Sequence, residues 1–347
     1  MRLFAFALAM SLLALVAAFP GDLRSETSLS VKASLSADDP RSKILEGWIA
    51  ELASQTGWSA EVELLGPGAV AGARTAMADP DGLTLGFLSL DETITRPLQD
   101  LAPYRASDFL PAVLFPGDPP VLVRRPGGPD VEISRRRPGQ DRAARLLAPS
   151  LNPVPGPTLA AVAALRSLGY VPSVRELPAD YAAGAPAGAS GSEAPAGASG
   201  REAPWAAAFA ALEPGELLAL PREALDLLPP LGLSPAQVMT LSPPAAGVGT
   251  PAHLALPGGT APADPGAAPG VRELFGFYYP SATGPRLQEG APARLAAMAS
   301  AAFASPQDFP FVTGPPMTAD EAREAFDAET AARRSILESL NLAGGAQ

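Results

Sequence analysis

The sequence predicts an α/β protein that is built as two lobes joined by more than one crossing strand. Strand-like and helix-like segments alternate through about the first 120 residues, the middle third shows the same alternation more weakly, and long helices return near the end. Such alternation is typical of a largely parallel sheet that is covered by helices. With 347 residues the chain is long enough for two domains, each with a core of its own.

Residues 1–18 are predicted to be a secretory signal peptide. Arg2 precedes an uncharged apolar run, and Val16-Ala17-Ala18 fits the small-x-small cleavage rule. The run is short for a bilayer span, although an uncleaved anchor is the alternative reading. The chain has no cysteine, which excludes a lipid-modified N-terminus, disulfides and thiolate metal sites. We therefore expect a periplasmic protein that is not a lipoprotein.

Charge and motif content argue against several function classes. The net charge of −11 becomes −12 without Arg2, and an acidic chain is a poor nucleic-acid partner. The sequence has no GxSxG, HExxH or Walker motif, and His253 is the single histidine, read here as a loop residue. We expect no enzyme activity, cofactor or metal. The basic run 134–145 is read as a solvated face, with docking to an acidic partner as the alternative.

The first strands and helices follow from local patterns. Leu29–Leu35 alternates apolar and polar residues, as a half-buried strand does. Residues 39–57 read as a helix that Asp39 caps, with one apolar face. A second strand covers residues 60–64. Between residues 66 and 89 a small-residue turn, a short helix and a PDG turn lead into an apolar strand.

Later segments divide the chain into two lobes. Weaker strands lie at residues 217–220 and 238–241, and a tandem nonapeptide within residues 184–203 is read as a flexible surface insertion. A strand ending at Pro280 is followed by helices, the last of which opens with a capping box of Thr318 and Glu321. We assign residues 25–122 and 258–347 to lobe 1 and residues 123–257 to lobe 2.

Three groups of motifs resemble one protein family. "GPGAVAGARTAMADPDGLTL" is similar to a PGAGG…A…PDGYTL stretch, and "DFLPAVLF" is similar to DFxPVALL. "LFGFYYPSATGP", "RLAAMASAAF" and "TADEAREAFDAE" look like WFGLFAPAGTP and two helices that follow it. Over residues 29–123 and 273–340 the chain thus resembles a divergent member of the substrate-binding proteins of the tripartite tricarboxylate transporter family, also called Bug receptors.

This resemblance implies a two-lobed, periplasmic-binding-protein-like architecture of type II, a Venus flytrap with a cleft between the lobes. It implies a monomeric receptor that captures a small, carboxylate-bearing solute and delivers it to integral membrane permease subunits. Such receptors hold anions with backbone N–H groups of loops at helix N-termini. Closure of the lobes then buries the solute.

The resemblance also places the candidate ligand residues by position. Residues 36–42, 66–72 and 89–90 form three loops of lobe 1, and residues 148–158 form a loop of lobe 2. Tyr278, or its neighbour Tyr279, lines the cleft from the late strand. The candidates are Asp38, Asp39, Arg41, Ser42, Gly68, Ala69, Ser89, Leu90, Ser150, Asn152, Thr158 and Tyr278.

The first loop departs from the family pattern, because "ADDPRSK" replaces a PGGSTD-like stretch and its proline has no N–H to donate. Three readings stay open. In the first, Asp39 caps its helix and points to solvent, Arg41 and Ser42 act as donors, and the solute is a carboxylate. In the second, Asp38 and Asp39 attract an amine or zwitterion. In the third, the receptor is binding-deficient and serves as a sensory or protein-interaction partner. An exported hydrolase would depend entirely on His253.

Overall fold

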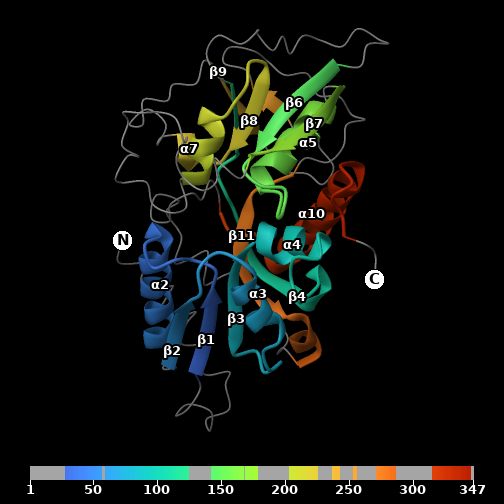
Figure 1. Cartoon of the computed structure of the whole chain (residues 1–347). Coiled ribbons are helices and arrows are strands. Elements are labelled where there is room, and N and C mark those ends of the chain that lie inside the picture. The colour runs from blue at the N-terminus through green and yellow to red at the C-terminus, as the bar shows by residue number, and fades with distance from the viewer. Residues whose placement is uncertain are drawn as a thin grey trace.

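The structure is a computed structural model, and it describes residues 28–56, 59–124, 142–167, 169–178, 203–225, 237–242, 253–255, 271–286 and 315–344. Two β-sheets with their helices form two lobes, one below the other in Figure 1. The predicted signal peptide, the basic run 134–145 and the nonapeptide repeat lie almost entirely outside the described residues. The predicted helix after Pro280 lies outside them as well.

The first sheet has five strands in the order β2-β1-β3-β11-β4. Strands β1 (Ser28–Ala33), β2 (Ser59–Leu64) and β3 (Thr84–Ser89) are parallel to one another. Strand β11 (Leu274–Pro280) runs antiparallel to both β3 and β4 (Phe109–Pro116). The carboxyl ends of β1, β2 and β3 therefore meet at one edge of the sheet, which is where ligands bind in open α/β sheets.

Apolar periodicity explains how this sheet is covered. Leu29, Val31 and Ala33 of β1 are buried, as the alternation predicted. They pack with Leu45 and Trp48 of helix α2 (Pro40–Thr56) on one face. Helix α3 (Ala69–Ala76) packs on the other face in a cluster that also contains residues of β3, β4, β11 and the last helix. Both faces of the sheet are thus buried, as expected for parallel strands.

The second sheet has six strands in the order β10-β9-β5-β8-β6-β7. These are β5 (Val121–Arg124), β6 (Arg142–Ala148), β7 (Tyr170–Glu176), β8 (Glu216–Leu220), β9 (Gln237–Ser242) and β10 (His253–Ala255). Strands β6, β7 and β8 are parallel, whereas β5 is antiparallel to β8 and β9. In each sheet three parallel strands are followed by one antiparallel strand and then by a strand parallel to the first three: β2-β1-β3-β11-β4 in the first and β7-β6-β8-β5-β9 in the second. The two lobes therefore share one topology.

Helices cover both faces of the second sheet. Helix α5 (Gly156–Ser167) is buried along nearly its whole length in one core cluster. Helices α7 (Ala203–Ala210) and α8 (Arg222–Leu225) lie on the other face, where Phe209 and Ala224 are buried. The weak strands expected at residues 217–220 and 238–241 are confirmed as β8 and β9.

The chain crosses between the two sheets twice, as expected from the sequence. The first crossing joins β4 to β5, and the second leads into β11 from β10 of the other sheet. The two crossings contact each other, because the Gly117 N–H donates to the Glu273 carbonyl at 2.8 Å. A Cβ on Gly117 would lie 3.1 Å from that carbonyl oxygen, so glycine permits the close approach. The exact lobe limits at residues 122 and 258 stay a prediction.

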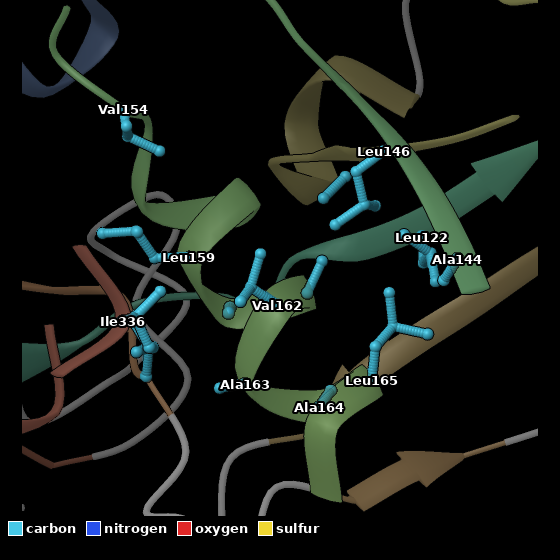
Figure 2. Packing of buried hydrophobic residues seen from close by; sticks show 14 of the residues in the cluster. Leu122, Ala144, Leu146, Val154, Leu159, Val162, Ala163, Ala164, Leu165 and Ile336 are labelled. Carbon is cyan, nitrogen blue, oxygen red and sulfur yellow. The ribbon is translucent and has the colours of Figure 1, made fainter. Parts of the chain in front are cut away.

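Helix α10 (Ala319–Ser339) is shared by both lobes. Its expected capping box is present, since Thr318 Oγ1 accepts from the Glu321 N–H and the Glu321 carboxylate accepts from Thr318. Phe326 packs in the first lobe, in the cluster with α3, whereas Ile336 and Leu337 pack in the second, in the cluster with α5. Figure 2 shows Ile336 beside Leu159 of α5. One helix therefore completes two cores.

Three short helical segments connect β3 to β4, and the first two lie at the edge that faces the second lobe. Asp91–Thr95 forms a short π-helical turn, η1, and Arg96–Leu98 continues it as α4. A 3-10 turn, η2 (Ala106–Asp108), then leads into β4. A further 3-10 segment, η4 (Ser281–Arg286), follows β11. Among the described residues, no helix is both long enough and apolar enough to span a membrane.

Candidate functional site

The candidate site lies where the carboxyl ends of β1, β2 and β3 face the N-terminus of α5 in the second lobe (Figure 1). Three loops of the first lobe end here, at the starts of α2, α3 and η1. N-terminal helix ends present backbone N–H groups that have no partner within the helix, so they attract anions. The groups that accept hydrogen bonds from these N–H donors therefore determine which ligands the site can bind.

The N-terminus of α2 is held by Asp39. The Asp39 carboxylate accepts from the Arg41 N–H at 2.9 Å and from the Arg41 guanidinium at 3.0 and 2.7 Å. Asp39 does cap the helix, but the expectation that it points to solvent is wrong, because only 6% of it is exposed. Ser42 Oγ donates to the Ser36 carbonyl at 2.6 Å, which fixes the loop, whereas Asp38 is exposed.

The centre of the edge is occupied by Glu92, which the sequence reading missed. Its Oε2 accepts from Ser34 Oγ at 2.6 Å and from the N–H and Oγ of Ser89, each at 2.8 Å. Its Oε1 accepts a longer bond from the Gly68 N–H at 3.4 Å. Burial raises the pKa of the Glu92 carboxyl, while these donors oppose the shift. The ends of three strands thus converge on one carboxylate.

Two of the sequence candidates, Gly68 and Ser89, are donors in this arrangement. Gly68 precedes α3 with φ +133°, a conformation that favours glycine. Ala69 begins α3 and is half-buried. The signal that would have led to Glu92 was present in the sequence, because Ser89 and Glu92 have the spacing of a capping box.

Two other candidates are core residues. Leu90 is 1% exposed and Tyr278 is fully buried, and both lie in the cluster shared by α3, β4 and α10. Packing accounts for the Leu90 side chain and for the aromatic ring of Tyr278. Tyr279, the neighbour considered with Tyr278, is also buried, and burial raises the pKa of its hydroxyl to about 12.

The second lobe contributes the loop between β6 and α5. The Asn152 N–H donates to Ser150 Oγ at 2.9 Å, while Asn152 itself is exposed. Thr158 lies in the first turn of α5 and is fully buried. The Gly156 N–H, at the N-terminus of α5, donates to Asp91 Oδ2 at 3.0 Å. Asp91 belongs to the first lobe, so this bond joins the lobes across the site.

Further polar contacts hold the lobes together beside the site. Gln99 donates to the Leu151 carbonyl at 2.8 Å and accepts from the Val154 N–H at 2.9 Å. Arg333 of α10 is fully buried and donates to Asp91 and, at 2.7 Å, to Thr95 Oγ1.

The second acidic residue that contacts Arg333 is Glu329, which also belongs to α10. Arg333 Nε lies 3.6 Å from a Glu329 oxygen, and Glu329 also accepts from Arg272 Nε at 3.0 Å. Burial raises the pKa of Glu329, and the two arginines oppose that shift. Among the described residues no group of acidic or histidine side chains forms a metal-binding cluster.

The two lobes share one topology and are joined by two crossings. This arrangement is a periplasmic-binding-protein-like fold of the two-lobed type II class. No family model and no curated protein matches the sequence. Solved structures match it nearly end to end. A TctC solute binding protein from Polaromonas, solved without ligand, has a TM-score of 0.55 at 15% identity, covering 90% of this chain and 98% of that one.

Two further structures agree. A protein of R. palustris solved with adipate has a TM-score of 0.55 at 15% identity, covering 92% of this chain and 98% of its own. The periplasmic binding protein BugD has a TM-score of 0.50 at 12% identity, covering 91% and 98%. The chain therefore has the fold of the TctC and Bug binding proteins, which confirms the architecture expected from the motifs.

Proposed function

We propose that the protein is an exported, monomeric solute-binding receptor. It captures a small organic solute between its lobes and delivers it to a membrane transporter of the tripartite tricarboxylate type. One observation carries the proposal: hydrogen-bond donors from both lobes converge on carboxylates at the edge where β1, β2 and β3 end. A carboxylate-bearing solute is the class that the resemblance implies, and the adipate in a structure of the same fold supports it.

A non-enzymatic role agrees with the residues of the site. Among the described residues, its polar groups are carboxylates, hydroxyls and arginines that hold one another, rather than a nucleophile paired with a base. His253 belongs to β10 of the second sheet, so the expectation that it is a loop residue is wrong. If an esterase or peptidase activity were nevertheless detected, it should disappear in a His253→Ala variant, and unchanged activity would exclude a hydrolase that depends on His253.

The first test is thermal melting of the purified protein against carboxylates, amino acids and amines. A ligand that binds only the folded state at one hundred times its dissociation constant stabilises by about 2.7 kcal/mol, which a melt detects. Stabilisation by a single solute class supports the receptor function, and silence across a broad panel contradicts it. Uptake of the labelled solute by cells with and without the protein then tests delivery, and light scattering tests the monomer.

A ligand-divergent or binding-deficient receptor is the second candidate function, and one observation favours it. The donors at the starts of α2, α3 and α5 already hold acidic residues of the chain itself: Asp39, Glu92 and Asp91. Such a protein would retain the fold and serve as a sensory or protein-interaction partner. The melting panel separates the two candidates.

A further inference from the structure

Asp91 and Glu92 are consecutive residues whose carboxylates accept hydrogen bonds from different lobes. The Glu92 carboxylate is held within the first lobe by Ser34, Gly68 and Ser89. The Asp91 carboxylate accepts from the Gly156 N–H at the start of α5 in the second lobe, at 3.0 Å. The pair therefore places one carboxylate against donors of each lobe, as a bound solute with two carboxylates would.

The contacts of Glu92 exceed those of an ordinary helix cap. Glu321 at the start of α10 provides the comparison, because its carboxylate also accepts from the N–H and Oγ of a hydroxyl residue three positions earlier, at 2.8 Å each. Glu321 is exposed, whereas Glu92 is 6% exposed. Glu92 also accepts a 2.6 Å bond from Ser34, which follows a different strand. A local cap requires neither the burial nor the donor from β1.

The contacts of Asp91 show a matching arrangement on the second lobe. A Cβ on Gly156 would lie 3.1 Å from Asp91 Oδ1 and would overlap the Glu273 carboxylate, so glycine permits the approach. Arg333 supplies a buried cation to the same Asp91 carboxylate. A backbone N–H at a helix N-terminus and a buried guanidinium are the donors that hold a carboxylate in proteins.

We propose that Asp91 and Glu92 are a built-in dicarboxylate that fills one carboxylate position in each lobe and thereby determines the specificity of the receptor. The inference rests on the proposed receptor function and changes its solute class, from a solute with carboxylates at these two positions to one without them. A solute of the wild-type protein binds through groups other than carboxylates at these two positions, since a second carboxylate there would meet the first at close range. Removing both side chains should open both positions to a free dicarboxylate.

The test uses a D91S/E92A variant, with D320S/E321A as the matched control that alters a consecutive Asp-Glu pair in the exposed first turn of α10. Both variants and the wild type are titrated by calorimetry with acetate, with succinamide and with dicarboxylates from malonate to adipate. We expect D91S/E92A to bind one chain length of dicarboxylate at least tenfold more tightly than acetate, and not to bind succinamide. The wild type and the control should bind none of these probes.

The outcomes separate this inference from the proposed function. Dicarboxylate binding by D91S/E92A alone supports the inference, even if the wild type binds nothing in the melting panel and the solute-receptor proposal fails. A wild type that binds a dicarboxylate as tightly as D91S/E92A does would keep the receptor proposal and overturn the inference. A folded D91S/E92A that binds no carboxylate also overturns it.

A second comparison applies if D91S/E92A does not fold. Glu92→Gln and Glu321→Gln keep the side-chain shape and remove the charge from two capping-box residues. We expect the drop in melting temperature to be several times larger for Glu92→Gln than for Glu321→Gln. The reason is that Glu92, unlike Glu321, also accepts hydrogen bonds from residues that follow β1 and precede α3. Equal shifts would mean that Glu92 is an ordinary cap, and the inference would be overturned.

Discussion

Replacement of Arg333 by Met removes a buried cation that contacts both Asp91 and Glu329. Arg333 is fully buried, and it also donates to Thr95 at 2.7 Å and to the Arg272 carbonyl at 3.1 Å. Removing one partner of a buried ion pair costs about 3–5 kcal/mol, because a buried charge is left uncompensated. Arg272 still binds Glu329, so we expect a loss of about 3 kcal/mol in the free energy of unfolding.

The assay is urea unfolding followed by far-UV circular dichroism. Arg334→Met is the control, since Arg334 is the next residue of the same helix and is exposed. Surface substitutions of that kind change stability by about 0.5 kcal/mol or less. A loss for Arg333→Met below about 1 kcal/mol, or equal to the control, would show that this cluster is not a coupled buried network.

The loss should also depend on pH in a definite direction. Burial raises the pKa of Glu329 above its ordinary value of 4.5, and Arg333 opposes that shift. Without Arg333 the folded-state pKa rises further. A carboxyl with a raised folded-state pKa binds more protons when folded, so stability falls as the pH rises from about 4.5 through that pKa. Arg333→Met should therefore cost less at pH 5 than at pH 8, and adding Glu329→Gln should remove the difference.

Three further predictions follow from buried contacts. Gln99→Ala leaves the buried Val154 N–H and the Leu151 carbonyl without a partner between the lobes, at a cost of about 1–3 kcal/mol in urea unfolding. Gly276→Ala places a Cβ against the backbone of β4, so its cost should lie near the top of the about 1–3 kcal/mol range for overpacking. Glu92, whose pKa is raised by burial, makes the wild type less stable as the pH rises above about 4.5, and Glu92→Gln should flatten this slope in thermal melts.

Each of these three has a result that would contradict it. Unchanged unfolding of the Gln99 variant would mean that water replaces the contacts between the lobes. A Gly276→Ala protein with wild-type stability would show that β4 and β11 have room to separate. For Glu92→Gln, a stability profile parallel to that of the wild type between pH 4 and 8 would show that Glu92 does not titrate there.

Local patterns were sufficient for most of the described elements. The alternation in β1, the capped apolar face of α2 and the capping box of α10 each depend on residues a few positions apart. Their outcome is fixed by local geometry and by which face is buried, so the sequence predicts them well. The order of strands and helices then led to two α/β lobes, and the resemblance to the Bug receptors led to the type II architecture.

The chemistry of the site depends on contacts between distant segments, and the sequence reading missed it. Glu92 meets Ser34 across 58 positions, and Asp91 meets Arg333 across 242. No local pattern encodes such pairings. One signal was available, because Glu329 and Arg333 lie four residues apart on the apolar face of α10, where a charged pair is expected to be buried and partnered.

The position of α10 in the chain has a consequence for how the protein acquires its structure. Synthesis delivers residues 319–339 after every other described strand and helix, yet these residues fill gaps in both hydrophobic clusters. Until they leave the ribosome, one apolar face of each sheet stays incompletely covered, and a nascent chain exposes two incomplete cores at once. Such surfaces favour aggregation during folding, so the nascent protein should depend on chaperones until its final helix docks.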